Sequence, residues 1–367
     1  LAAAAQESGL RNIDYGDPVP EESTFKRYYY PAPCSSATIT LASVFAHASL
    51  TLSKFGSLKD YAEDLRKRAL SAWAYYGSHP KSATCDDGTI KSGRADVKLD
   101  EQDARAVVAA VYLFALTGDT QFNAFIEKNR RFTQPFKEDT WSVYQAPEGD
   151  ALLFYTTLPR ADSELRSAIL ERKLSKWERG DIFGMKPEKD LYRAFMLEYS
   201  YHWGSNQPRA NTGNTNYDIV QYKLVSGEQA ESARDRAAGI LNSFHGVNPM
   251  QIVYLSQMGA YGAEHSCNEM YHTWFRDGDK RWDSAKDSVF GPAPGYVTGG
   301  PNKSYCENDK DHKCYVSEFR KQPAQKAYID FNTSDVPERD YDMSWELTEP
   351  AIYYQAAYVK LLSKFVD

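Results

Sequence analysis

The chain has 367 residues and a formal net charge of −7, and its Lys and Arg residues are spread along its length. Nucleic acids and anionic membrane surfaces are bound through basic patches, so this charge pattern argues against both as partners. We find no apolar run near the ~20 residues that span a bilayer, and we expect a soluble monomer that acts on an uncharged partner.

The first 33 residues are polar and turn-rich, with no helical or strand periodicity. We predict that residues 1–33 form an extended approach segment and that residues 34–367 form one domain. The chain opens on Leu1 without an initiator Met or a basic region, so we expect a fragment or a mature form rather than a complete translation product.

Most of the remaining chain has the apolar spacing of helices, separated by polar or Gly-containing breaks. We predict helices at residues 37–55, 58–75, 100–116, 120–131, 162–177, 189–199, 228–244, 248–259 and 352–365, and one more after Asn211. Successive helices joined by short turns form antiparallel hairpins, and alternating strand patterns are scarce. The pattern therefore predicts an all-α protein built of helix hairpins.

The long polar connections and the cysteines lie between these helices. Residues 80–98 form one long polar loop, and residues 291–302 are too rich in Gly and Pro for a helix or a strand. Five cysteines, an odd number, leave at least one thiol free if the others pair. Cys306 and Cys314 bracket a polar loop and are candidates for a short disulfide in an oxidising compartment.

The stretch from Ser344 to Val359 places carboxylates beside aromatic residues. Glu346 and Glu349 lie near Trp345 and Tyr354, and Glu349 stands where a helix should begin. A carboxylate at that place can serve the helix dipole, or it can act as an acid on a sugar. The residues alone leave both interpretations open.

Blocks of residues follow one another in a recognisable order: residues 100–101 with 117–119, 203–206, 246–249 with Tyr254 and Gly259, 294–302, and 348–356. In this order they resemble the blocks of glycoside hydrolase family 9, the inverting cellulases, over about residues 33–362. The resemblance implies a secreted (α/α)6 barrel that cuts β-1,4-glucosidic bonds of cellulose or a related β-glucan, with no cofactor required for the chemistry.

The family's general acid falls on Glu349, and Asp340 and Trp345 precede it in the family's order. We therefore assign Glu349 and Asp340 to the catalytic site. In an inverting hydrolase one protonated carboxyl donates to the leaving oxygen, and an ionised carboxylate ~6.5–9.5 Å away activates water. Trp345 and Tyr354 would favour the protonated acid by excluding solvent, and both are candidate substrate-binding residues.

The chain also departs from the family's pattern. The family's base lies in an Asp-Ala-Gly-Asp motif, which is absent here, and Asp14-Tyr15-Gly16-Asp17 resembles it only superficially. We expect the family's N-terminal part, with the base, to precede Leu1. A carbohydrate-binding pseudo-enzyme without a base is therefore the alternative function. Tyr353 and Gln355, where the family has Asp and Asn, suggest a divergent subgroup.

Further candidates for substrate binding come from two other stretches. Trp203, Asn206 and Arg209 could form a sugar platform, since an indole stacks on a pyranose face while the amide and guanidinium reach hydroxyls. The family's Pro-His-His-Arg motif is absent, and His272 and Trp274 are its nearest substitutes. Buried structural roles are the competing interpretation for these residues.

Two metal sites are conceivable from the residue types. If residues 264–275 are helical, His265, Glu269 and His272 share one face, which would suit a metal-dependent hydrolase. Asp96, Asp100 and Glu101 resemble the family's calcium-binding loop, although calcium needs six to eight oxygens. The alternative for this second group is an acidic cluster that caps a helix.

Overall fold

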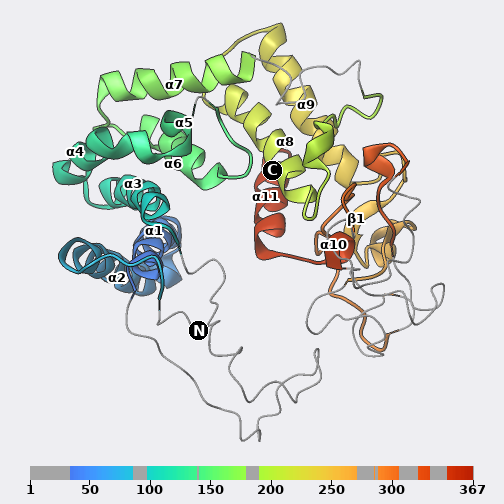
Figure 1. The fold of residues 1–367 in the computed structure, drawn as a ribbon, viewed down its shortest axis with the longest axis horizontal. Helices are drawn as coiled ribbons and strands as arrows, with labels where there is room; N and C mark the ends of the chain where they lie inside the picture. The colour runs from blue at the N-terminus through green and yellow to red at the C-terminus, as the bar shows by residue number, and fades with distance from the viewer. Residues whose placement is uncertain are drawn as a thin grey trace, which may run out of the picture. The chain divides into compact units, whose positions relative to one another are not determined.

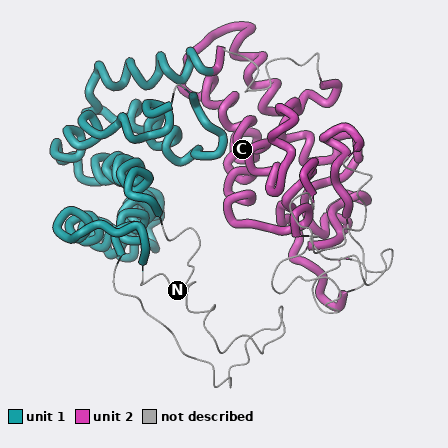
Figure 2. The backbone as a smooth tube through the Cα atoms, viewed as in Figure 1, with its two compact units in different colours: residues 1–12, 20–176 teal, residues 13–19, 177–367 magenta. Residues whose placement is uncertain are grey.

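The computed structural model describes residues 34–85, 97–138, 140–178, 190–270, 285, 288–305, 321–330 and 345–366. The chain forms two compact units, whose main boundary lies between Lys176 and Trp177 (Figure 2). Unit 1 holds the described residues up to Lys176, and unit 2 holds those from Trp177 onwards.

Unit 1 is built of helices that follow one another along the chain (Figure 1). They are α1 (Ser35–Leu52), α2 (Lys59–Ser78), α3 (Leu99–Thr117), α4 (Thr120–Asn129), α5 (Gln134–Lys137), α6 (Ala146–Thr156) and α7 (Ser163–Glu178), with 3-10 turns η3 (Gly56–Leu58) and η5 (Arg130–Phe132). The last residues of α7 belong to unit 2. Ile39 and Ala42 of α1 pack with Tyr76 of α2 and with Ala106 and Ala109 of α3.

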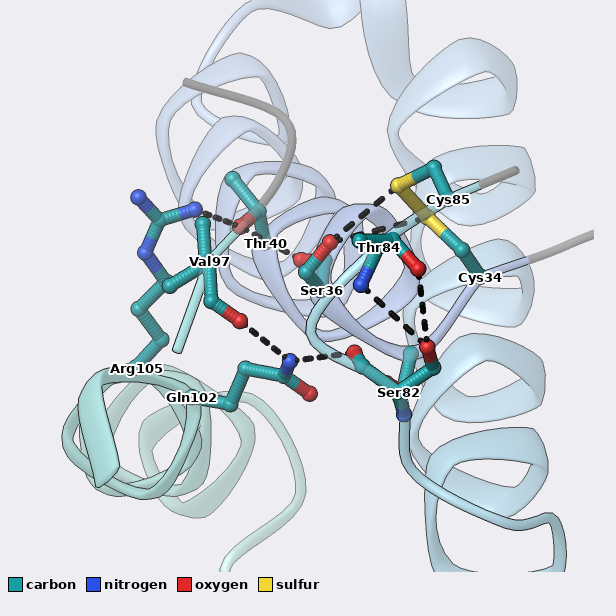
Figure 3. The surroundings of a disulfide bond; sticks show 10 residues. Cys34, Ser36, Thr40, Ser82, Thr84, Cys85, Val97, Gln102 and Arg105 are labelled. Carbon is teal, nitrogen blue, oxygen red and sulfur yellow. Dashed lines mark hydrogen bonds between the residues drawn. A yellow bond between two sulfur atoms is a disulfide. The ribbon is translucent and has the colours of Figure 1, made fainter. Parts of the chain in front are cut away.

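A disulfide bond joins Cys34, at the N-cap of α1, to Cys85 in the loop after α2 (Figure 3). The same loop is fixed by Ser82, whose carbonyl accepts hydrogen bonds from Ser35 Oγ at 3.0 Å and from Gln102 Nε2 at 2.7 Å. The start of α1, the end of α2 and the start of α3 are therefore tied together. Cys267 is free and buried, and Cys306 and Cys314 lie outside the described residues.

Helix α1 is long and apolar enough to cross a membrane, by length and composition alone. Our expectation that no stretch meets this test is therefore wrong for α1. The core helix of a soluble protein meets the same test, and α1 packs against α2 and α3 through small buried residues such as Ala42 and Ala46.

Unit 2 combines helices with long loops and two short strands. Its elements are α8 (Asn206–Gln221), α9 (Glu228–Phe244), β1 (Val253–Ser256), β2 (Ser266–Cys267), α10 (Trp345–Thr348) and α11 (Ile352–Leu362), with 3-10 turns η7 (Glu198–Ser200), η8 (Gly259–Tyr261) and η10 (Ala324–Lys326). Strands β1 and β2 pair in parallel. Gly213 allows α8 to approach its neighbours, because a Cβ there would lie 2.7 Å from Leu361 of α11 and 3.0 Å from Ile240 of α9.

Two predicted helices are wrong, at residues 189–199 and 248–259. Asp190 Oδ1 and Oδ2 accept the amides of Tyr192 and Ala194, and Asn248 Oδ1 accepts the amide of Met250. Such local side-chain bonds hold the backbone in turns and compete with helix formation. The other predicted helices are confirmed within a few residues, except that α8 begins at Asn206, before the predicted segment after Asn211. Helices α5, α6 and α10 were not predicted.

We expect the disulfide to stabilise unit 1. Closing a loop between residues 51 positions apart stabilises a fold by about 4 kcal/mol in the chain-entropy model. The double variant Cys34→Ser, Cys85→Ser should lower the free energy of unfolding by up to that amount, measured by denaturant titration. A peptide digest without reductant should show Cys34 joined to Cys85, and free thiols at both positions would contradict the pairing.

Glu148, in the first turn of α6, provides a test of pH dependence. Its carboxylate accepts a hydrogen bond from the Gln134 amide at 2.5 Å, but burial outweighs that bond and raises the pKa of Glu148 above 4.5. Just above pH 4.5 the folded state then binds more protons than the unfolded state, so this group reduces stability as pH rises through its folded pKa. Glu148→Gln keeps an acceptor and removes the charge.

Relative to the unchanged protein, the Glu148→Gln variant should gain stability between pH 4 and pH 7, measured as the difference in Tm at each pH. The sign follows because only the unchanged protein must ionise a buried carboxyl over that interval. Parallel Tm profiles for the two proteins would contradict the prediction.

Candidate active site

Glu349 lies between α10 and α11, and its carboxylate meets Trp203 from the segment before α8. Trp203 Nε1 donates a hydrogen bond to Glu349 Oε2 at 2.7 Å, across 146 positions of sequence. The amide of Glu349 donates to the Trp345 carbonyl at 3.1 Å, which continues the turn of α10. Trp203 is 47% exposed and Glu349 is half-buried, so neither residue is closed off from solvent.

The segment that carries Trp203 is docked against α11. Gly204 has a φ of +82°, and a Cβ at this residue would overlap the hydroxyl of Tyr354. Tyr354 is itself buried, so its ring forms a wall behind Gly204. A larger residue at Gly204 would therefore displace the indole that contacts Glu349.

The loop at residues 298–300 connects α8 to the turn before Glu349. Asn206 donates its backbone amide to the Gly299 carbonyl and its Nδ2 to the Thr298 carbonyl, both at 2.9 Å. On the other side, the Gly300 amide donates to the Leu347 carbonyl at 3.0 Å. The loop therefore bridges the first residue of α8 and the residues that lead into Glu349.

The two carboxylates of this stretch have different surroundings. Asn302 Nδ2 donates to Glu346 Oε2 at 3.1 Å, and the Asn302 amide donates to the Ala327 carbonyl at 2.7 Å. Glu346 therefore holds the loop in place. Glu349 instead accepts its hydrogen bond from Trp203, an exposed aromatic residue.

The other predicted substrate-binding residues are less accessible. Asn206 and Arg209 are 0% and 1% exposed, Tyr354 is buried and Trp345 is half-buried. The contacts of Asn206 are those of a residue that anchors a loop. Direct sugar contacts from these residues stay predictions.

Sequence reasoning missed the role of Gln355 on α11. Its Nε2 donates to the Gly295 carbonyl at 3.1 Å, and its Oε1 accepts the Val297 amide at 2.9 Å. The available signal was that Gln355 stands where the resembled family has Asn, another amide that can donate and accept at once. Ile352 and Tyr353, at the start of α11, are exposed and were also not selected as ligand contacts.

Several predicted residues lie outside the described parts of the chain. They are the catalytic candidate Asp340, the substrate candidates His272 and Trp274, the calcium candidate Asp96, and residues 14–17. Their predicted roles are neither supported nor opposed by the structure.

The structure bears differently on the two predicted metal sites. Residues 263–270 form turns and strand β2, so the helical face expected for His265 and Glu269 is wrong. Asp100 is paired with Lys137 at 2.9 Å, which lowers the pKa of the Asp100 carboxyl, and Glu101 is exposed beside it. Within the described residues no group of three or more His, Cys, Asp or Glu side chains could hold a metal ion. Calcium binding stays a prediction.

Comparisons with known proteins agree on one family. The family model described as "Glycosyl hydrolase family 9" matches residues 9–362. A search of curated proteins finds no match.

Among solved structures, AaCel9A in complex with cellobiose-like isofagomine is 21% identical, with a TM-score of 0.66 over 91% of this chain and 56% of that one. A single mutant (D468A) of a thermostable endoglucanase from Alicyclobacillus acidocaldarius is 19% identical, with a TM-score of 0.62 over 90% and 55%. A metagenome-derived glycoside hydrolase family 9 endoglucanase is 20% identical, with a TM-score of 0.64 over 90% and 52%.

The chain thus spans about half the length of the solved structures that it matches. At these identities the likeness establishes the fold. It confirms the predicted fold class, an all-α (α/α)6 barrel of helix hairpins, here with two short strands added in unit 2.

The loop that leads to Glu349 provides a matched pair of glycines. Gly300 (φ +94°) and Gly295 (φ +88°) both occupy the left-handed region, so an alanine at either costs about 1–2 kcal/mol in backbone strain. A Cβ at Gly295 meets nothing within 4 Å, whereas a Cβ at Gly300 lies 2.5 Å from the Asn206 side chain. We expect Gly300→Ala to reduce the unfolding free energy by about 1–3 kcal/mol more than Gly295→Ala.

Denaturant titration of the two variants measures this difference. Adding Asn206→Ala to Gly300→Ala should cost less than Asn206→Ala alone, because in the Gly300→Ala background it also removes the side chain that the new Cβ meets. Equal losses for the two glycine variants would show that the loop does not press on Asn206.

Proposed function

Because the chain belongs to glycosyl hydrolase family 9, we propose that it is a glycoside hydrolase of the cellulase type that cleaves β-1,4-glucosidic bonds. The observation that carries this proposal is the placement of Glu349, whose carboxylate is held at the surface by the exposed indole of Trp203. The order of the sequence blocks and this geometry both support Glu349 as the residue that acts.

Glu349 is the general acid in this proposal, and the mechanism is inverting. The protonated carboxyl donates its proton to the glycosidic oxygen as the bond to the sugar carbon breaks, and an ionised carboxylate activates water on the opposite face. Asp340 remains a candidate residue of the catalytic site. This acid and base chemistry uses carboxylates alone and requires no cofactor.

The substrate we propose is cellulose or a related β-glucan. Trp203 offers an exposed indole that can stack on a pyranose ring, directly beside the acid. The binding of cellobiose-like isofagomine by AaCel9A, which shares the fold, is consistent with a β-glucan for this chain as well. An uncharged polymer also agrees with the net charge of −7 and with Lys and Arg residues that are spread along the sequence.

We also propose an extracellular location, action as a monomer, and a structural calcium ion near Asp96, Asp100 and Glu101. The disulfide between Cys34 and Cys85 supports an oxidising compartment. The ion pair of Asp100 with Lys137 would have to open to free that carboxylate for calcium.

Glu349→Gln should reduce the release of reducing ends from a soluble cellulose derivative by about 10²–10⁴-fold, since an amide cannot donate the proton. The loss should be much smaller on an aryl cellobioside with an acidic phenol, because that leaving group needs little protonation. Glu346→Gln is the matched control, since its amide oxygen can still accept the bond from Asn302.

Equal activity of the Glu349→Gln variant and the unchanged protein would contradict the assignment of Glu349 as the general acid. If the unchanged protein releases no reducing ends, retardation in gels that contain glucan distinguishes a carbohydrate-binding pseudo-enzyme from a protein that does not bind glucan. The same assays identify the preferred glucan.

A further inference from the structure

Arg209 on α8 is a buried charge without a partner of opposite sign in contact. It is 1% exposed, and its Nε and Nη2 atoms make no hydrogen bond. Its guanidinium carbon lies 5.6 Å from the ring centroids of both Tyr201 and Tyr254. Two aromatic rings therefore flank the cation, but neither neutralises it.

A guanidinium stays protonated in proteins, so burial cannot remove this charge. A buried charge is costly unless it is paired or hydrogen-bonded. Asp190 is a buried carboxylate of the same unit, but its oxygens accept bonds from the amides of Tyr192 and Ala194 and from Gln325. None of the described carboxylates forms an ion pair with Arg209.

Further unsatisfied donors belong to the same region. The hydroxyls of Tyr254 and Ser205 are buried and make no hydrogen bond. Ser205 precedes Arg209 by four residues at the start of α8, so the two share one side of the helix. Burial raises the pKa of Tyr254, which keeps its hydroxyl a protonated donor rather than a counter-charge.

The start of α8 contributes a favourable field. Its first amides are already used, since Asn206 donates to Gly299 and Gln207 donates to Gly204. The N-terminal end of this 16-residue helix nevertheless carries partial positive charge, which attracts anions. The cation, the hydroxyl donors and the helix dipole therefore all favour negative charge in this part of unit 2.

We propose that Arg209, Tyr254 and Ser205 bind a small monovalent anion, of the size and charge of chloride, inside unit 2. Burial of all three side chains excludes larger anions such as gluconate. A water molecule would satisfy the donors and leave the charge uncompensated. Asn206 Oδ1 is a buried acceptor without a partner in the same region, and it suits a water molecule beside the anion.

This role differs from the sugar platform expected from the sequence, and it goes beyond the proposed function. The anion would stabilise the start of α8, which carries Asn206 and follows Trp203. Its effect should therefore appear in the stability of the folded chain, whether or not the chain hydrolyses a glucan.

The test compares thermal unfolding of the full chain in sodium chloride and in sodium gluconate at equal ionic strength. At chloride about ten times its dissociation constant, Tm should rise by about 2–4 °C over gluconate. Arg209→Met should remove this difference. Arg236→Met is the matched control, since Arg236 also lies 5.6 Å from an aromatic ring, that of Trp177, and should keep the chloride effect.

Crystals of the unchanged protein soaked in bromide provide a second measurement that does not require the variant to fold. An anomalous peak within hydrogen-bond distance of Arg209 supports the proposal. Equal Tm values in chloride and gluconate together with no peak, or an equal chloride effect in Arg209→Met, would overturn it in favour of buried water.

Discussion

Two hydrogen bonds from Asn206 determine where the candidate acid lies. The side chain and amide of this residue hold the carbonyls of Thr298 and Gly299, and the next amide, that of Gly300, holds Leu347. Three segments far apart in the sequence are thereby fixed to one another. Glu349 lies two residues after Leu347, so the position of its carboxylate depends on bonds that begin on α8.

Helix α8 can hold these segments in place because it is buried despite its polar sequence. Asn214 donates to the Ala357 carbonyl of α11 at 3.0 Å, and Trp177 donates to Asn216 at 3.1 Å. Gly213 lets α11 approach closely. Buried polar groups are costly unless they are paired, so these bonds favour one alignment of α8 and α11 over others. Tyr354 on α11 is then presented to Gly204 in a single register.

The sequence predicted the helices well where apolar periodicity decided the structure, as in residues 228–244, whose limits match α9. The predicted helices at residues 189–199 and 248–259 were wrong, because the side chains of Asp190 and Asn248 accept hydrogen bonds from nearby backbone amides. Apolar periodicity carries no information about such bonds. Motif order selected Glu349. Other features depend on tertiary packing, which a single sequence does not display. They are the contact of Glu349 with Trp203, the burial of Arg209 and the two hydrogen bonds of the Gln355 side chain.

The hydrogen bond between Trp203 and Glu349 also makes the two oxygens of the carboxyl group inequivalent. An indole N–H can only donate, so Oε2 must keep a lone pair directed at Trp203 for as long as the bond persists. A carbonyl oxygen accepts a hydrogen bond better than a hydroxyl oxygen, so this bond favours Oε1 as the site of a proton on Glu349. In the role of general acid that we propose for Glu349, the indole would set the direction from which the carboxyl delivers its proton, and so the face of a bound ligand that receives it.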